Sequence, residues 1–100
     1  MKNIQSIEQV GTEGKKLLVI GTDWCTYCGK TYAAIKDVMP GHPDVEILKI
    51  DGDDEPEILG EIEAKTYPQL LLYDGGALVA QRESADTETL RAWLAENGVA

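Results

Sequence analysis

The residues of this chain best suited to chemistry are its two cysteines, which are separated by two residues. Cys25 and Cys28 lie within the segment Trp24-Cys25-Thr26-Tyr27-Cys28, and the 100-residue sequence has no other cysteine. A dithiol at this spacing can close to a disulfide and reopen, carrying two electrons in each cycle. The pair therefore predicts reversible thiol chemistry.

The segments on either side of the pair predict how the two thiols divide the work. Residues 16–20 form an apolar, partly β-branched run typical of a buried strand, and from Thr26 onward apolar residues recur at helical spacing until Pro40-Gly41. Cys25 then caps a helix start, where free N–H groups and the helix dipole favour its thiolate. Cys28, one turn further on, shares a face with it. We expect Cys25 to attack a disulfide and Cys28 to resolve the mixed disulfide that forms.

Two other uses of a cysteine pair are less consistent with the sequence. A zinc or iron–sulfur half-site needs two further ligands, and the chain offers no third cysteine and a single histidine, His42, in a Pro- and Gly-rich loop. A structural disulfide closing so short a loop would stabilise the fold by at most ~2 kcal/mol. We therefore expect redox use and no bound metal or cofactor, since both electrons reside on the two sulfurs.

Composition predicts one small domain spanning residues 1–100. The net charge of −9 argues against nucleic acid or an anionic membrane as a partner. No apolar run approaches a membrane span, and the first residues lack the apolar centre of a signal peptide. The expectation is a monomer located in the cytoplasm.

Many of the acidic residues fall between Asp51 and Glu63, which raises the possibility of a calcium loop. An EF-hand loop starting at Asp51 needs glycine at its sixth position and glutamate at its twelfth, but Pro56 and Ile62 stand there. The alternative is a helix with Pro56 at its first position and acidic residues around its N-terminus, placing Ile58, Leu59 and Ile62 against the core. We expect the acidic cluster to be mainly a solvated face.

The remaining segments predict an α/β fold. Ser6 and Gln9 resemble a capping box for a short helix after a strand stub at residues 2–4, and residues 45–50 form a further strand. Residues 69–73 and 77–82 read as an antiparallel hairpin turned by Asp74-Gly75-Gly76. Ser84 or Asp86 can cap a last helix, whose stripe is Leu90, Trp93 and Leu94 and which ends before Gly98. This order predicts a central mixed sheet of four to five strands with helices on both faces.

With these elements in place, the chain resembles the thioredoxin family over nearly its whole length. The resemblance rests on Trp24-Cys25-x-x-Cys28 between strand and helix, and on Tyr67-Pro68 ahead of the hairpin. It implies the thioredoxin fold, with a cis Pro68 lying against the cysteine pair. It also implies substrate binding by residues around the cysteines: Trp24, Thr26, Tyr27, Tyr67, Pro68 and the segment Glu83-Ser84-Ala85.

Several positions depart from the common thioredoxin pattern. Val19 stands where many thioredoxins bury an aspartate thought to assist proton removal from the resolving cysteine, and Ile47 stands where they place a lysine. Exchange is therefore expected to depend more steeply on alkaline pH. Thr26-Tyr27 replaces the usual Gly-Pro, and a tyrosine before the second cysteine resembles glutaredoxins, as does Thr66-x-Pro68-Gln69. Ser84-Ala85-Asp86-Thr87 is only an approximate substitute for the glutaredoxin glutathione clamp.

The sequence thus favours a dithiol oxidoreductase that reduces protein disulfides, with electrons from a separate reductase or from glutathione. A glutaredoxin-like, glutathione-dependent reductase is the first alternative. An oxidase or isomerase is built from the same parts. A non-catalytic thioredoxin-fold binding module, docking through Trp24, Tyr27 and Tyr67, is the alternative from another class.

Overall fold

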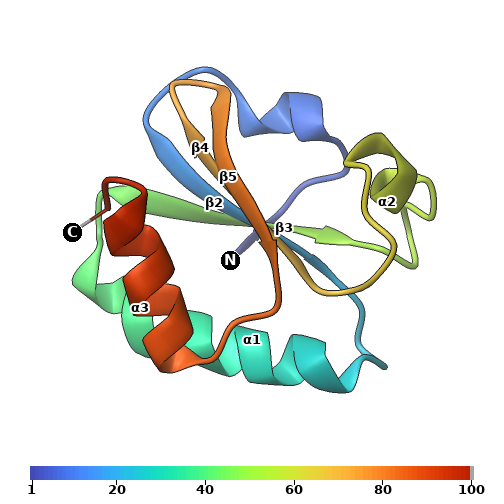
Figure 1. Cartoon of the computed structure of the whole chain (residues 1–100). Helices are drawn as coiled ribbons and strands as arrows, with labels where there is room; N and C mark the ends of the chain where they lie inside the picture. Colours follow the sequence, from blue (N-terminus) through green and yellow to red (C-terminus); the bar gives the residue numbers. More distant parts are fainter. Residues whose placement is uncertain (100) are drawn as a thin grey trace.

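A five-stranded mixed sheet forms the centre of the molecule (Figure 1). The computed structural model describes residues 1–99, and its strands lie in the order β1-β3-β2-β4-β5. Their bounds are Lys2–Asn3 (β1), Lys15–Gly21 (β2), Val45–Asp51 (β3), Gln69–Asp74 (β4) and Ala77–Glu83 (β5). The predicted fold class, a mixed sheet with helices on both faces, is confirmed.

Strand β2 is the middle strand and delivers the chain to the cysteines. It runs parallel to β3, with Leu17 opposite Ile47, and antiparallel to β4, with Leu17 opposite Leu72. Residues Leu17 to Ile20 are all fully buried, as expected for a strand covered on both faces. The C-terminal ends of β2 and β3 therefore meet at one end of the sheet, where Gly21 pairs with Asp51.

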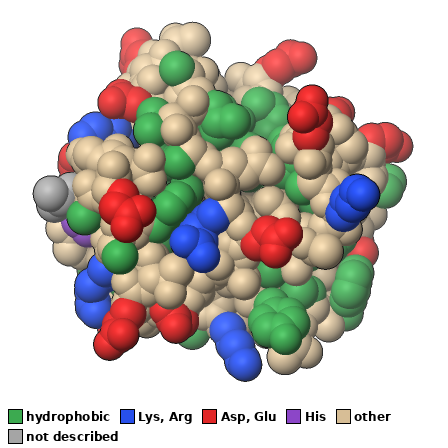
Figure 2. Space-filling view, viewed as in Figure 1, with side chains coloured by type: hydrophobic (Ala, Val, Ile, Leu, Met, Phe, Trp, Pro, Cys, Tyr) green, Lys and Arg blue, Asp and Glu red, His purple; other side chains and the backbone are tan. Residues whose placement is uncertain are grey.

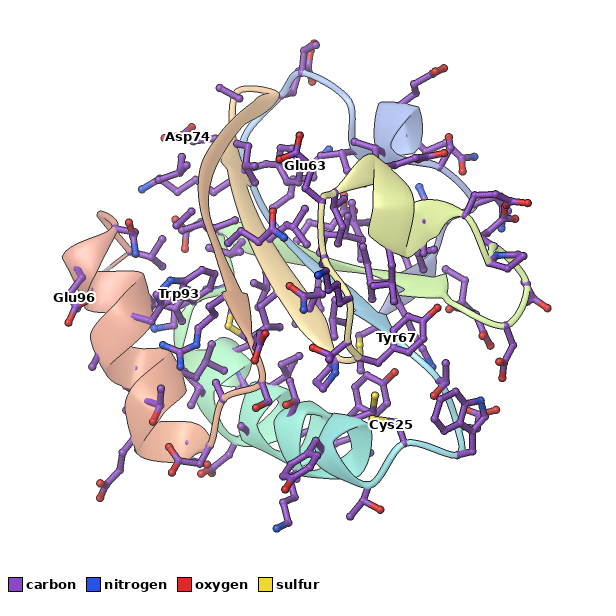
Figure 3. The ribbon with its side chains drawn as sticks, turned by 45° about the vertical axis from the view of Figure 1, so that its right-hand side comes forward. Cys25, Glu63, Tyr67, Asp74, Trp93 and Glu96 are labelled. Atoms are coloured by element: carbon purple, nitrogen blue, oxygen red, sulfur yellow. The ribbon has the colours of Figure 1, made fainter. Side chains whose placement is uncertain are left out.

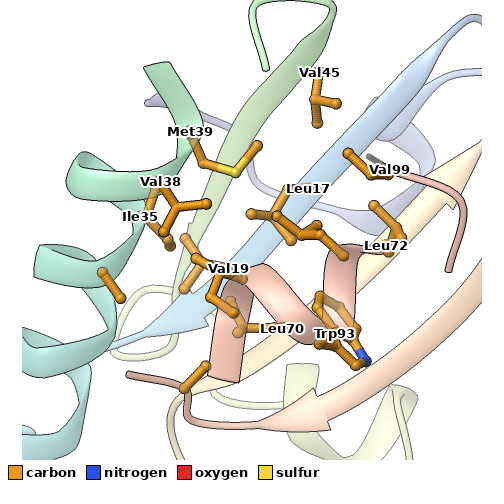
Figure 4. Packing of buried hydrophobic residues seen from close by; sticks show 14 residues of the cluster. Leu17, Val19, Ile35, Val38, Met39, Val45, Leu70, Leu72, Trp93 and Val99 are labelled. Carbon is orange, nitrogen blue, oxygen red and sulfur yellow. The ribbon is translucent and has the colours of Figure 1, made fainter. Parts of the chain in front are cut away.

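Two hydrophobic layers cover the sheet. One lies beneath helices α1 (Thr26–Val38) and α3 (Thr87–Glu96) and contains Leu17, Val19 and Trp93 (Figure 4). The other contains Leu18 and Ile20 and is closed by the short helix α2 (Ile58–Glu61) and the 3-10 turn η1 (Ile7–Val10). Figure 1 shows α1 and α3 side by side on one face of the sheet. Alternate residues of β2 thus serve opposite layers.

The ends of α1 and α3 follow the predicted signals. Cys25 caps α1, which ends at Val38 and is followed by the 3-10 turn η2 (Met39–Gly41) containing Pro40. Of the two candidate caps for α3, Asp86 is the one used: its carboxylate accepts a 2.8 Å hydrogen bond from the Thr89 amide, and this bond lowers the pKa of Asp86. The β4–β5 turn places Gly75 and Gly76 at φ of 62° and 87°, a conformation that favours glycine.

The two remaining helix predictions need correction. Pro56 is not the first residue of a helix, because α2 begins only at Ile58 and has a single turn. Of the residues predicted to face the core, Ile58 is buried and Ile62 packs against the same hydrophobic layer, whereas Leu59 is only partly covered and is not part of that layer. The N-terminal helix is a 3-10 turn, although its capping box is present, with Gln9 Oε1 accepting from the Ser6 amide at 3.1 Å. Isolated segments this short have too few hydrogen bonds to offset helix nucleation.

Candidate redox site

Cys25 lies where strand β2 gives way to helix α1. Its backbone is extended, as an N-cap requires, and its Sγ accepts a 3.2 Å hydrogen bond from the Cys28 amide. The side chain is partly exposed, so a disulfide in another molecule can reach the sulfur. Cys25 therefore presents a reachable sulfur that a backbone N–H holds at the start of α1.

Cys28 lies one helical turn further in and is fully buried. Burial is the main reason that its pKa rises from 9.0 to about 11, and the hydrogen bond and charge of Cys25 add to the rise. The backbone amide of Thr22 acts in the opposite direction. Both cysteines are free thiols in this structure. The pair thus combines an accessible sulfur with a hidden, protonated one.

The segment Tyr67-Pro68 faces the cysteine pair from the other layer of the molecule. The peptide bond between these residues is cis, and Pro68 is buried, as the family resemblance implied. The carbonyl oxygen of Tyr67 lies 3.6 Å from Cys25 Sγ. Figure 3 shows Tyr67 above Cys25, at the end of the sheet away from Asp74. The cis-proline segment therefore borders the accessible sulfur directly.

Two exposed aromatic residues, Trp24 and Tyr27, adjoin the cysteines in the sequence and differ in their contacts. Trp24 is 69% exposed; its indole N–H is shared between the two carboxylate oxygens of Asp53 at 3.0 and 3.1 Å, and its ring meets Tyr67 edge-on with centroids 6.1 Å apart. Tyr27 is 63% exposed, with Lys30 Nζ 5.7 Å from its ring centre. Trp24 is thus tied to the loop after β3 and to Tyr67, whereas Tyr27 projects from the first turn of α1.

A shallow groove of about 280 Å³ lies between the first turn of α1, the segment before Pro68 and the end of β5. Its lining brings together the predicted residues Tyr27, Tyr67 and Ser84, with Glu83 of the predicted segment and Thr66. Thr26 is exposed on the first turn of α1 and does not line this groove. Ala85 is buried, and its amide donates to the Thr31 hydroxyl at 3.3 Å. The segment 83–85 therefore contributes Glu83 and Ser84 to the surface, while Ala85 anchors it.

Comparison with known proteins agrees with this geometry. The family model described as Thioredoxin matches residues 5–96. The chain belongs to the thioredoxin family. It is 23% identical over 99 residues to thioredoxin-2 of Saccharomyces cerevisiae, covering 97% of this chain and 95% of the relative. It is 24% identical to the mitochondrial thioredoxin-3 of the same yeast, covering 90% of this chain and 72% of that protein.

Solved structures of other thioredoxins share the fold at low identity. Oxidised mitochondrial thioredoxin 3 from S. cerevisiae superposes with a TM-score of 0.82 at 20% identity, with 96% of this chain and 94% of that chain covered. Thioredoxin f2 from Chlamydomonas reinhardtii gives a TM-score of 0.81 at 20% identity, with 100% and 98% covered. Family membership and the Cys25–Cys28 pair together make this chain a thioredoxin-like oxidoreductase.

The structure also shows what surrounds the departures from the usual thioredoxin pattern. Val19 is fully buried in the layer beneath α1 and α3, and Ile47 packs against the same layer. The charged residues closest to the cysteines in sequence do not replace the missing aspartate, because the Asp23 side chain is 90% exposed and Lys30 lies on the surface. Across residues 1–99, no group of His, Cys, Asp or Glu side chains is arranged to hold a metal ion. Within the same range, no helix is long and apolar enough to cross a membrane.

Charged side chains are mixed over the surface. Basic side chains are scattered among acidic ones on the face shown in Figure 2. The acidic residues near the site mostly face solvent. Asp51 accepts a 2.8 Å hydrogen bond from the Asp53 amide, and Asp53 in turn accepts from the Trp24 indole. The acidic cluster thus contacts the site through Asp53.

Some residues of the site escaped the sequence analysis. Gly52 supports the Tyr67 ring, Asp53 holds the Trp24 indole, and Gly21 leaves room beside Cys28. Gly21 ends β2, and Gly52 and Asp53 are the first two residues after β3, so their position at the cysteine end of the sheet was a usable signal. The contacts that these residues make could not be predicted, because they join residues far apart in the chain.

Proposed function

We propose that this protein reduces disulfide bonds in other proteins, with Cys25 as the nucleophile and Cys28 as the resolving thiol. The observation that carries the proposal is the contrast between the two sulfurs. Cys25 Sγ is partly exposed and receives an N–H from the Cys28 amide at 3.2 Å, whereas Cys28 is fully buried behind it. This contrast supports Cys25 as the sulfur that meets the substrate and Cys28 as the sulfur that attacks the intermediate.

The reaction follows from these positions. The Cys25 thiolate attacks one sulfur of the substrate disulfide, forming a Cys25–substrate disulfide and releasing the other substrate sulfur as a thiolate. Cys28 then loses its proton and attacks Cys25 Sγ, so that the Cys25–Cys28 bond forms and the second substrate thiolate leaves. The two substrate thiolates take protons from solvent. The enzyme ends oxidised by two electrons and returns to the dithiol at the expense of a separate reductase or of glutathione.

Substrate binding is assigned to the surface around Cys25. An extended substrate segment lying in the groove between Tyr27, Tyr67 and Ser84 would pass beside the sulfur, with Trp24 and Tyr27 supplying exposed aromatic surface. The protein can reduce substrates only in a compartment that keeps its own cysteines reduced. We therefore propose that it is located in the cytoplasm.

The first experiment measures the redox potential of the pair. The protein is equilibrated with graded ratios of reduced and oxidised glutathione, and the thiol state is read by alkylation and mass spectrometry. A potential near about −270 mV supports a thioredoxin-like reductant, and about −200 to −230 mV supports the glutaredoxin-like alternative. A value of about −120 to −180 mV indicates an oxidant or isomerase. If the cysteine pair is neither oxidised nor reduced in any mixture, the proposed function is wrong and the non-catalytic binding module is the remaining alternative.

A further inference from the structure

Two buried hydroxyl groups have no hydrogen-bond partner within residues 1–99. They are Thr22 Oγ1 and Tyr32 Oη, and they are the only buried side-chain polar atoms in that range left without one. A buried polar atom without a partner costs free energy, so such atoms are few in native proteins. These two come from different segments, the residue directly after β2 and the middle of α1, yet both lie beside Cys28.

Gly21 shows how close the Tyr32 hydroxyl comes to the buried sulfur. A Cβ added to Gly21 would meet Tyr32 Oη, and it would lie 3.1 Å from Cys28 Sγ. The phenol oxygen and the sulfur therefore border the same small space, which exists because residue 21 has no side chain. Thr22 follows Gly21 directly and helps to lower the pKa of Cys28, although its hydroxyl falls short of a hydrogen bond.

The phenol ring is held in place by a cation. Lys49 Nζ, from the neighbouring strand β3, lies 4.7 Å from the centre of the Tyr32 ring, and its second contact is with Asp23 at 3.9 Å. Burial raises the pKa of Tyr32, as do the facing charges of Cys28, Asp23, Asp51 and Cys25. The hydroxyl thus keeps its proton over the physiological range and acts as a donor.

The buried thiol needs hydrogen-bond donors when it ionises. Resolution requires Cys28 to become a thiolate inside the protein, and burial opposes that change. The position that an aspartate occupies in many thioredoxins holds Val19, which cannot assist. A donor that forms its hydrogen bond only with the thiolate stabilises the thiolate relative to the neutral thiol.

We propose that the hydroxyls of Tyr32 and Thr22 are donors reserved for the Cys28 thiolate, satisfied only during the resolving step. This inference rests on the proposed function. When Cys28 releases its proton to solvent, Tyr32 Oη–H and Thr22 Oγ1–H donate to the new thiolate and keep their own protons. The thiolate then attacks Cys25 Sγ, the Cys25–Cys28 bond forms, and the substrate sulfur leaves with the electron pair.

Stopped-flow reaction with one equivalent of 5,5′-dithiobis(2-nitrobenzoate) separates the two steps. Attack by Cys25 releases a first thionitrobenzoate, and attack by Cys28 on the mixed disulfide releases the second. We expect Tyr32→Phe to leave the first phase unchanged, to slow the second by about 10-fold at neutral pH, and to move its pH midpoint upward by about one unit. Thr22→Val is expected to act in the same direction with a smaller effect.

The matched control is Tyr73→Phe, which removes a hydroxyl from a buried tyrosine in the opposite hydrophobic layer. It should leave both phases as in the parent. A second phase in Tyr32→Phe and Thr22→Val with the parent's rate and pH midpoint overturns the inference, and so does an equal slowing of both phases. If the parent itself releases only one thionitrobenzoate or none, the proposed function fails instead.

Discussion

The ring of Tyr67 lies directly on the backbone of Gly52, and its hydroxyl donates to the Gly52 carbonyl at 3.4 Å. Gly52 follows strand β3, whereas Tyr67 precedes strand β4, so the contact joins two loops at the cysteine end of the sheet. Since the Tyr67 carbonyl lies 3.6 Å from Cys25 Sγ, the Gly52 contact helps to place the edge of the redox site.

A methyl group at position 52 should displace Tyr67. A Cβ on Gly52 would overlap the phenol ring, so we expect Gly52→Ala to lower the free energy of unfolding by about 1–3 kcal/mol and to slow disulfide reduction. Urea denaturation and a disulfide-reduction assay measure the two effects. The control is Gly60→Ala in α2, where an added Cβ meets nothing and should raise stability by up to about 1 kcal/mol. Equal stability of the Gly52 variant and its parent would contradict the assignment.

Replacement of the buried cysteine should trap the intermediate. Cys28→Ser keeps Cys25 exposed at the helix start but removes the resolving sulfur, so a Cys25–substrate disulfide accumulates. Non-reducing electrophoresis and mass spectrometry detect the adduct. Cys25→Ser is the control and should form no adduct, because Cys28 is fully buried. An adduct formed by Cys25→Ser as readily as by Cys28→Ser would reverse the proposed roles.

The reduced protein should lose stability in strong alkali because of Cys28. Its pKa is raised from 9.0 to about 11, so between these values the unfolded chain has lost the proton that the folded chain still binds. The stabilisation is complete below about pH 9 and disappears as the pH rises toward about 11, amounting to at most about 3 kcal/mol. Urea denaturation of reduced parent and reduced Cys28→Ala across this range isolates the effect. Parallel curves for the two proteins would show that Cys28 titrates normally.

Tyr32→Phe should stabilise the reduced protein even though it impairs resolution. The variant removes a buried oxygen that has no partner, retains the ring beneath Lys49, and is expected to raise the free energy of unfolding by about 1 kcal/mol. Thermal denaturation of reduced parent and variant measures the change. A destabilised variant would indicate that the hydroxyl already has a partner in the reduced state.

Much of the fold could be predicted because the chain gives strong local signals. The apolar run before Cys25, the Asp74-Gly75-Gly76 turn and the stripe of Leu90, Trp93 and Leu94 each match one element of the structure. The single turn of α2 could not be predicted, because its extent depends on how Ile58 packs between loops. Acidic residues around Pro56 resembled a helix start but lie outside the helix.

In the site, too, local motifs could be predicted and contacts that depend on packing could not. Cys25 and Cys28 were predicted from their spacing and Pro68 from the family resemblance, and the structure places the carbonyl of the Tyr67-Pro68 bond 3.6 Å from Cys25 Sγ. Tyr32 falls at helical spacing from Cys28, but a tyrosine on an apolar stripe is ordinary core material. Its importance depends on a hydroxyl without a partner, on Gly21 opposite and on Lys49 above the ring, and these arise only when β2, β3 and α1 are packed together.

The two hydrophobic layers determine how the redox site responds when the core is weakened by a substitution or by heating. Cys25 caps α1, which packs on one layer, whereas Tyr67 packs against the other, so the 3.6 Å separation between the sulfur and the Tyr67 carbonyl bridges the two layers at the end of the sheet. A substitution that loosens either core, however remote from the cysteines, will shift one side of the site relative to the other. Catalytic efficiency should therefore decline at temperatures at which the sheet itself is still intact.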